Sequence, residues 1–149
     1  MANFIDSFNK GIKAADKARA NKDEIFSVIA DLSDQLSLAS EGKLKIDVVE
    51  KNETMNPFSI TAKDLFGRKT YSAIVASNPL AASYRPEELA RWRISESGYP
   101  CHVALPDTEI YCEDKVALEN ALARLIATPA AGKVLQSVMN QQVLTDDDF

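Results

Sequence analysis

The sequence predicts one α+β domain over residues 1–149, with an N-terminal helix pair, an antiparallel sheet of about four to five strands and a C-terminal helix pair. Apolar residues recur at helical spacing near both ends of the chain and alternate with polar residues in the middle. The chain has 149 residues, of which 46% are hydrophobic and 26% charged, which is typical of a globular domain with one core. No internal repeat or flexible linker divides it.

The N-terminal segment is expected to form two helices. The first, over about residues 3–19, follows from the apolar spacing of Phe4, Ile5, Phe8 and Ile12. Asn21 and Glu24 have the spacing of an N-cap and capping box, so a second helix is expected over about residues 22–40. Gly42 suits the left-handed residue after its end. A linker of about one or two residues predicts an antiparallel hairpin or a sharp corner.

The middle of the chain has the alternation of strands. Leu44, Ile46 and Val48 predict one strand, and Phe58, Ile60 and Ala62 predict a second. The apolar stretch 71–76 predicts a third, which Asn78-Pro79 ends. Residues 80–98 fit two interpretations. Pro86 is typical of a helix start, whereas alternating apolar residues around Trp92 favour a strand.

The segments 101–105 and 109–112 predict a hairpin closed by Pro106-Asp107. This loop places Cys101 opposite Cys112 and Val103 opposite Ile110, with His102 and Tyr111 on the other face. Because the apolar and polar residues then separate onto two faces, the pattern supports this register.

Two helices are expected after the hairpin. Asp114 is a suitable N-cap for a helix with Leu118, Leu122 and Leu125 on one face. Thr128-Pro129 has the pattern of a cap and first-turn proline for a last helix. Residues 145–149 form an acidic tail that is expected to fray.

The net charge is −5 and is unevenly distributed. Residues 1–42 carry −2, residues 43–98 carry +2 and residues 99–149 carry −5. The acidic last third favours a basic surface on another protein as partner. No uncharged stretch approaches the roughly 20 apolar residues of a membrane span, and the N-terminus lacks the apolar core of a secretory signal. A cytoplasmic protein without membrane contact is therefore expected.

Few residues have the chemistry of catalysis. His102 is the single histidine, and its neighbour Cys101 points to the opposite face of the predicted strand, which argues against a Cys-His pair. Structural zinc sites take about four Cys or His ligands, and the chain has one histidine and two cysteines. No phosphate-binding loop or nucleophile-elbow motif occurs. We therefore expect no enzyme activity, catalytic residue, metal or cofactor.

The favoured hypothesis is a non-catalytic protein-binding module. In this hypothesis it is an inhibitor or immunity protein, similar in role to an antitoxin, that neutralises a basic partner protein. Two groups of residues are candidates for partner binding: an acidic group around the hairpin and a Trp–Arg group of the kind common at interface hot spots. They are Asp107, Glu109, Glu113 and Asp114, and Arg91, Trp92 and Arg93.

Two other functions fit the sequence. Arg91, Trp92, Arg93 and Lys69 mix basic and aromatic groups, which is the composition of a single-stranded nucleic-acid site. An enzyme with an unrecognised carboxylate or tyrosine mechanism is the third hypothesis. The amphipathic helices at both ends offer apolar faces for self-association, and the pattern does not fix the oligomeric state.

Overall fold

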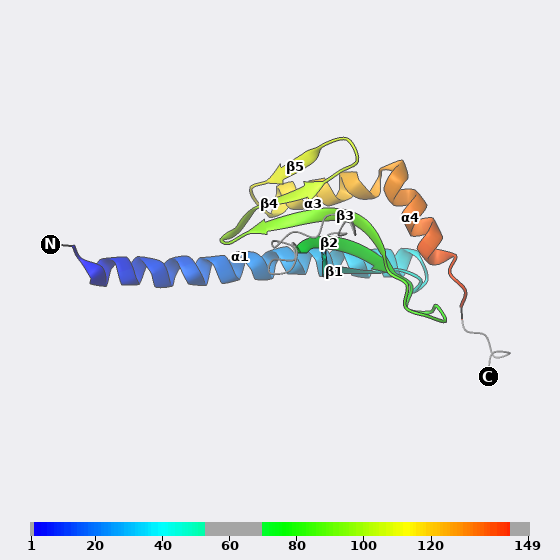
Figure 1. Ribbon diagram of the computed structural model, residues 1–149, viewed down its shortest axis with the longest axis horizontal. Coiled ribbons are helices and arrows are strands. Elements are labelled where there is room, and N and C mark those ends of the chain that lie inside the picture. Colours follow the sequence, from blue (N-terminus) through cyan, green and yellow to red (C-terminus); the bar gives the residue numbers. More distant parts are fainter. Residues whose placement is uncertain (1, 53–69, 144–149) are drawn as a thin grey trace, which may run out of the picture.

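The computed structural model describes residues 2–52 and 70–143. It shows a single α+β domain in which one helix precedes a five-stranded sheet and two helices follow it (Figure 1). Every neighbouring pair of strands is antiparallel, in the order β1-β2-β3-β4-β5. The elements are α1 (Phe4–Ala39), β1 (Lys45–Asn52), β2 (Thr70–Ser77), β3 (Glu87–Ser95), β4 (Gly98–Ala104), β5 (Glu109–Cys112), α3 (Lys115–Ile126) and α4 (Pro129–Met139).

The N-terminal helix pair predicted from the sequence is wrong, because α1 is one continuous helix of 36 residues. Asn21 does not act as an N-cap. Its side-chain Nδ2 instead donates to the carbonyl oxygen of Ser97 at 3.0 Å, across the fold. The segment 19–24 contains neither proline nor glycine, so nothing in the local backbone interrupts the helix. The helix does end as expected, with Gly42 in the left-handed region at φ +84°.

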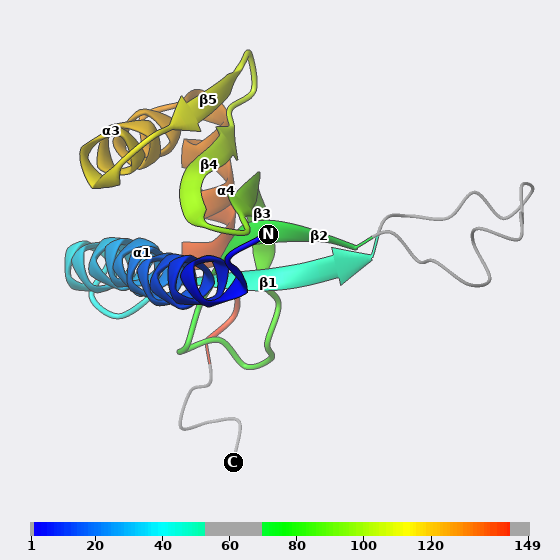
Figure 2. The ribbon, with the colours of Figure 1, turned by 90° about the vertical axis from the view of Figure 1, so that its left-hand side faces the viewer.

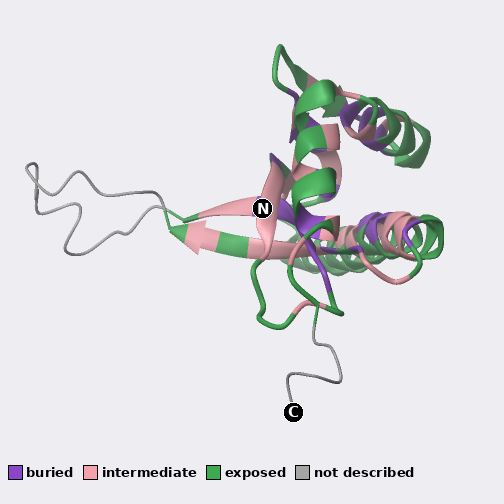
Figure 3. Ribbon diagram, turned by 90° about the vertical axis from the view of Figure 1, so that its right-hand side faces the viewer, coloured by how far each residue is buried: buried purple, intermediate pink, exposed green. Residues whose placement is uncertain are grey.

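One face of the sheet packs against the helices α1 and α3. Figure 2 shows α1 and α3 on the same side of the strands, and Figure 3 shows buried stretches on the strands and on these helices. The core joins apolar side chains from every helix and every strand, among them Ile25, Ile74, Val103, Leu118 and Val138. Burying large aliphatic side chains of this kind is the main favourable term in folding.

The two interpretations of residues 80–98 are resolved in favour of a strand over residues 87–95. Residues 87–95 form β3, with Ala90 and Trp92 on the core face. Pro86 precedes this strand and does not open a helix. The third expected strand is confirmed as β2, and Asn78 ends it with a buried side chain that donates to the carbonyl oxygen of Val138 at 3.2 Å.

The predicted hairpin register is confirmed. Cys101 lies opposite Cys112 and Val103 opposite Ile110, while His102 and Tyr111 pair on the other face with their rings 5.0 Å apart. The C-terminal caps are also confirmed, since Asp114 accepts from the N–H of Ala117 and the Thr128 hydroxyl from that of Ala131. The predicted strand at 58–62 and the tail at 145–149 lie outside the described residues.

Candidate protein-binding surface

The N-terminal part of α1 projects beyond the sheet. Figure 1 shows it extending past the strands, and every residue from 2 to 17 is exposed. We call residues 4–17 the arm. Four large apolar side chains on it are open to solvent, with exposed fractions of 78% for Phe4, 74% for Ile5, 66% for Phe8 and 49% for Ile12. A contiguous apolar surface left in water is typical of a binding site.

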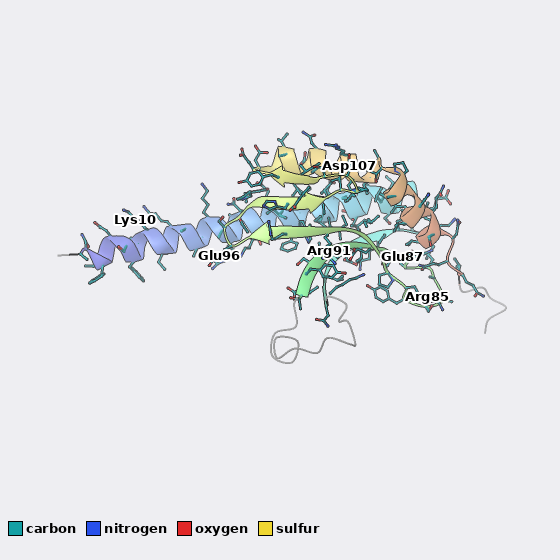
Figure 4. The ribbon with its side chains drawn as sticks, turned by 45° about the horizontal axis from the view of Figure 1, so that its top comes forward. Lys10, Arg85, Glu87, Arg91, Glu96 and Asp107 are labelled. Atoms are coloured by element: carbon teal, nitrogen blue, oxygen red, sulfur yellow. The ribbon has the colours of Figure 1, made fainter. Side chains whose placement is uncertain are left out.

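The apolar residues of the arm lie on one side of the helix. Phe8 follows Phe4 by four residues and Ile5 by three, and Ile12 follows Phe8 by four, so they form a stripe. Lys10, Lys13 and Lys17 fall on the opposite side of the helix at 3.6 residues per turn. Figure 4 labels Lys10 on this projecting end. The arm is therefore amphipathic, although its apolar side is exposed and does not pack on the core.

The base of the arm is fixed to the β3–β4 turn. Gly98, the first residue of β4 after this turn, has φ +90°, and a Cβ built there would lie 2.6 Å from the Cβ of Asn21. The Tyr99 hydroxyl donates to the Glu24 carboxylate at 2.7 Å. Desolvation, and then the hydrogen bond to Glu24, raise the pKa of Tyr99 above its ordinary value. The β3–β4 turn therefore approaches α1 closely and holds the helix just after the C-terminal end of the arm.

A cavity of about 560 Å³ lies beside this attachment. Two of the predicted partner-binding acids, Glu113 and Asp114, line it together with Glu24 and Lys17. Asp114 also caps α3, so one of its carboxylate oxygens is occupied by the N–H of Ala117 at 2.8 Å. The cavity brings acids of β5–α3 and α1 to one place, which the sequence did not predict.

The other two predicted acids form ion pairs within the chain. Asp107, at the tip of the β4–β5 turn, lies 3.9 Å from the Arg124 guanidinium (Figure 4). Glu109 on β5 lies 3.2 Å from Nδ1 of His102 and 4.0 Å from the Arg93 guanidinium. Exposed pairs of this kind are weak, and they nonetheless offset part of the charge available to a partner.

The predicted Trp–Arg group is divided between the two faces of β3. The Trp92 side chain is 4% exposed and lies in the core, where it meets Phe26 edge-on at 6.2 Å between ring centroids. Arg91 and Arg93 lie on the opposite face and are exposed, with Arg91 3.9 Å above the ring of Tyr71. The structure therefore does not place these three side chains on one surface.

The two apolar stripes of α1 differ in direction, and this difference is visible in the sequence. Around the helix, the stripe of Phe4, Ile5, Phe8 and Ile12 is rotated by about a third of a turn from the core-facing stripe of Ile25, Val28, Ile29 and Leu32. A straight helix cannot direct both stripes at one core. Because α1 is continuous, this offset turns the first stripe away from the core that the second stripe covers.

The described residues show no group of three or more His, Cys, Asp or Glu side chains able to hold a metal ion. None of the helices described is both long enough and apolar enough to cross a bilayer. We compared the chain with protein families, curated proteins and solved structures, and none of them matches it.

Cys101 and Cys112 are free and fully buried on the core face of the hairpin. Burial raises the pKa of the Cys101 thiol from 9.0 to about 12, and burial also raises that of Cys112. Since the thiolate is the reactive form, we expect the folded protein at pH 8 to react with a thiol reagent only as fast as it opens. Labelling with and without denaturant measures this. Rapid labelling of two thiols in the native protein would contradict it.

The same shift predicts a pH dependence of stability. A thiol with a raised folded-state pKa contributes its full stabilisation below pH 9, and this contribution falls as the pH rises toward 12, because the unfolded chain loses its protons first. Urea unfolding from pH 8 to 11 should therefore show a steeper loss for the natural protein than for the Cys101→Ala/Cys112→Ala variant. Equal slopes would contradict the prediction.

Proposed function

We propose that this chain is a non-catalytic protein-binding module whose binding element is the arm. One observation carries the proposal: Phe4, Ile5, Phe8 and Ile12 lie exposed on one side of a helix that projects from the domain. Laying the apolar side of such a helix into a groove is a common mode of protein recognition. Since the helix continues into the core, only its outer end has to be ordered when a partner binds.

The acidic residues have a secondary role in this proposal. Glu113 lies near the base of the arm, where a basic surface of the partner would meet it. Glu109 and Asp107 would steer the approach of such a partner more than they would hold it. An inhibitor or immunity function in the cytoplasm is the biological form that this acidic side favours, and it is tested by whether the captured partner loses its activity.

Site-specific photocrosslinking in the cells that naturally contain the protein tests the proposal. A photoreactive phenylalanine analogue at Phe8 should give a discrete crosslinked protein product, because that side chain is 66% exposed on the stripe. The matched control places it at Tyr84, which is 70% exposed in the β2–β3 connection. Ile12→Glu should abolish the Phe8 product. No product at Phe8, or the same product from both sites, would overturn the arm as the binding element.

Single-stranded nucleic-acid binding is the second candidate. Arg91 stacked on Tyr71 is the observation that favours it, since such groups can hold bases and phosphates. Burial of Trp92 removes the largest stacking group from this surface. Titration with single-stranded oligonucleotides at low salt decides between the functions. Binding below micromolar concentration that is lost in Arg91→Ala would favour nucleic acid over protein.

A further inference from the structure

We propose that the partner of the arm is a second copy of this chain, and that two arms pair antiparallel along their apolar stripes. This inference rests on the proposed function and names its partner. The resulting contact would be isologous, with the same surface used by both copies around a two-fold axis.

The residue spacing of the stripe is that of a short coiled coil. Ile5, Phe8, Ile12 and Ala15 occupy successive a and d positions at a spacing of three and four residues. In an antiparallel pair, Phe8 of one copy packs against Ile12 of the other, and Ile5 packs against Ala15. Each layer then pairs a larger side chain with a smaller one. The two-fold axis repeats each of these layers once in the dimer.

The stripe has a defined end. At the next a and d positions stand Arg19 and Lys22, after which the core-facing residues of α1 begin. The apolar surface offered for pairing therefore lies within the part of α1 that extends past the sheet (Figure 1). Two arms can overlap along this length.

The charges of the arm allow two copies to approach. Asp6, Lys10, Lys13 and Lys17 occupy the outer positions of the heptad, away from the contact. The positions that flank the a and d residues are neutral except at Asp16: Phe4, Asn9, Gly11 and Ala18. The pairing therefore brings no lysine of one arm against a lysine of the other.

The same charges disfavour an anionic lipid surface. The lysines lie on the side opposite the apolar stripe, so they would point away from the headgroups. The whole chain carries −5 and the arm +1, which leaves −6 on the rest of the molecule. A lipid surface of negative charge repels such a body. In the antiparallel pair of arms, the two bodies of charge −6 lie at opposite ends of the contact, which lessens the repulsion between them.

The available area sets the strength of the contact. From their exposed fractions, the four large apolar side chains offer on the order of 500 Å² per copy. This is below the roughly 800 Å² per partner of a standard stable interface, so the contact belongs to the weak class. We expect a reversible monomer–dimer equilibrium at micromolar or higher concentration, with no permanent dimer.

Sedimentation equilibrium of the full chain over a wide concentration range tests the pairing. The natural protein should pass from monomer to dimer, and Phe8→Glu should stay monomeric. Lys13→Glu, the matched control, introduces the same carboxylate on the outer side and should dimerise like the natural protein. Circular dichroism verifies that each variant is folded. A natural protein that stays monomeric throughout, or a Phe8→Glu variant that dimerises equally well, overturns the proposal.

Cysteine crosslinking tests the orientation. Phe8→Cys and Ile12→Cys variants, mixed and oxidised with diamide, should form mainly the mixed disulfide, because these positions face each other only in the antiparallel pair. Dominant Phe8→Cys homodimers would show parallel arms and overturn the arrangement. Cys101 and Cys112 are buried and should not interfere.

Two further measurements separate this inference from the function on which it rests. A monomeric natural protein whose Phe8 photocrosslink to a different protein is lost in Ile12→Glu retains the proposed function and overturns the second copy. The protein could instead be monomeric in solution and co-sediment with phosphatidylserine vesicles in a way that depends on Phe8. That result would overturn both the protein-binding function and the pairing of two copies, in favour of a lipid surface.

Discussion

Gly98→Ala is expected to destabilise the protein by about 2–5 kcal/mol, combining a left-handed backbone that disfavours side chains with an overpacked contact. Gly98 has φ +90°, and an added Cβ would lie 2.6 Å from the Cβ of Asn21 and 3.3 Å from its carbonyl carbon. These atoms belong to the rigid part of α1 and cannot swing aside. The turn must separate from the helix, with loss of the bond from Asn21 to Ser97. Urea unfolding measures the change.

Gly11→Ala is the matched control, because it adds the same methyl group to the same helix. Apart from the adjacent residues and the backbone of the helix itself, no heavy atom lies within 4 Å of the position where its Cβ would be, and the residue lies in the arm. We expect greater helicity of the arm by about 0.5–1 kcal/mol of propensity and no loss of global stability. Equal destabilisation by the two substitutions would show that the turn does not fix the base of the arm as described.

Ile25→Ala is expected to cost about 2–5 kcal/mol, as is typical when a large aliphatic side chain is removed from a core. Ile25 is completely buried and is the first residue of α1 that enters the core. It packs where the helix crosses the sheet, so its removal leaves a cavity between layers that cannot collapse freely. Chemical denaturation in dilute solution measures the cost without a contribution from self-association.

Phe26→Ala changes the adjacent residue and should cost much less. Phe26 is 48% exposed and meets Trp92 edge-on, a contact worth about 0.5–1.5 kcal/mol beyond burial. The comparison separates the core-facing side of α1 from the side that continues into the stripe. A greater loss at Phe26 than at Ile25 would contradict the orientation of the helix.

Local patterns were sufficient to predict the hairpin of β4 and β5. With Pro106-Asp107 as the loop, alternate residues divide into an apolar and a polar set, and a shift of one residue would mix them. The caps at Asp114 and Thr128 were predictable for the same reason, because each bonds to backbone groups three residues away. Interactions within a few residues leave a direct trace in the sequence.

Long-range contacts explain the failures. Asn21 has the residue type of a cap, but its side chain bonds to Ser97, 76 positions away, and the helix passes through it unbroken. Trp92 resembles a surface hot spot beside two arginines, yet the pleat of β3 directs it into the core. Neither outcome can be read from neighbours in the sequence, because each depends on which element packs there.

The sequence predicted the apolar residues of the candidate site, but it did not predict what surrounds them in the fold. The spacing of Phe4, Ile5, Phe8 and Ile12 correctly predicted a helix with an apolar side. The expectation of two helices joined by a short linker was wrong, because α1 is continuous and does not turn back. The acidic residues were predicted as one surface, and the structure pairs Asp107 and Glu109 with basic groups of the same chain.

Hydrogen exchange of the arm at increasing protein concentration tests the central claim most directly. A helix of this length without tertiary contacts is only marginally stable, so amides of residues 4–17 should exchange rapidly in dilute solution. Their protection should rise with concentration while that of residues 25–36 stays constant. Arm amides as protected as the core at the lowest concentration, or unaffected by concentration, would contradict an arm that is free in the monomer and paired in the dimer.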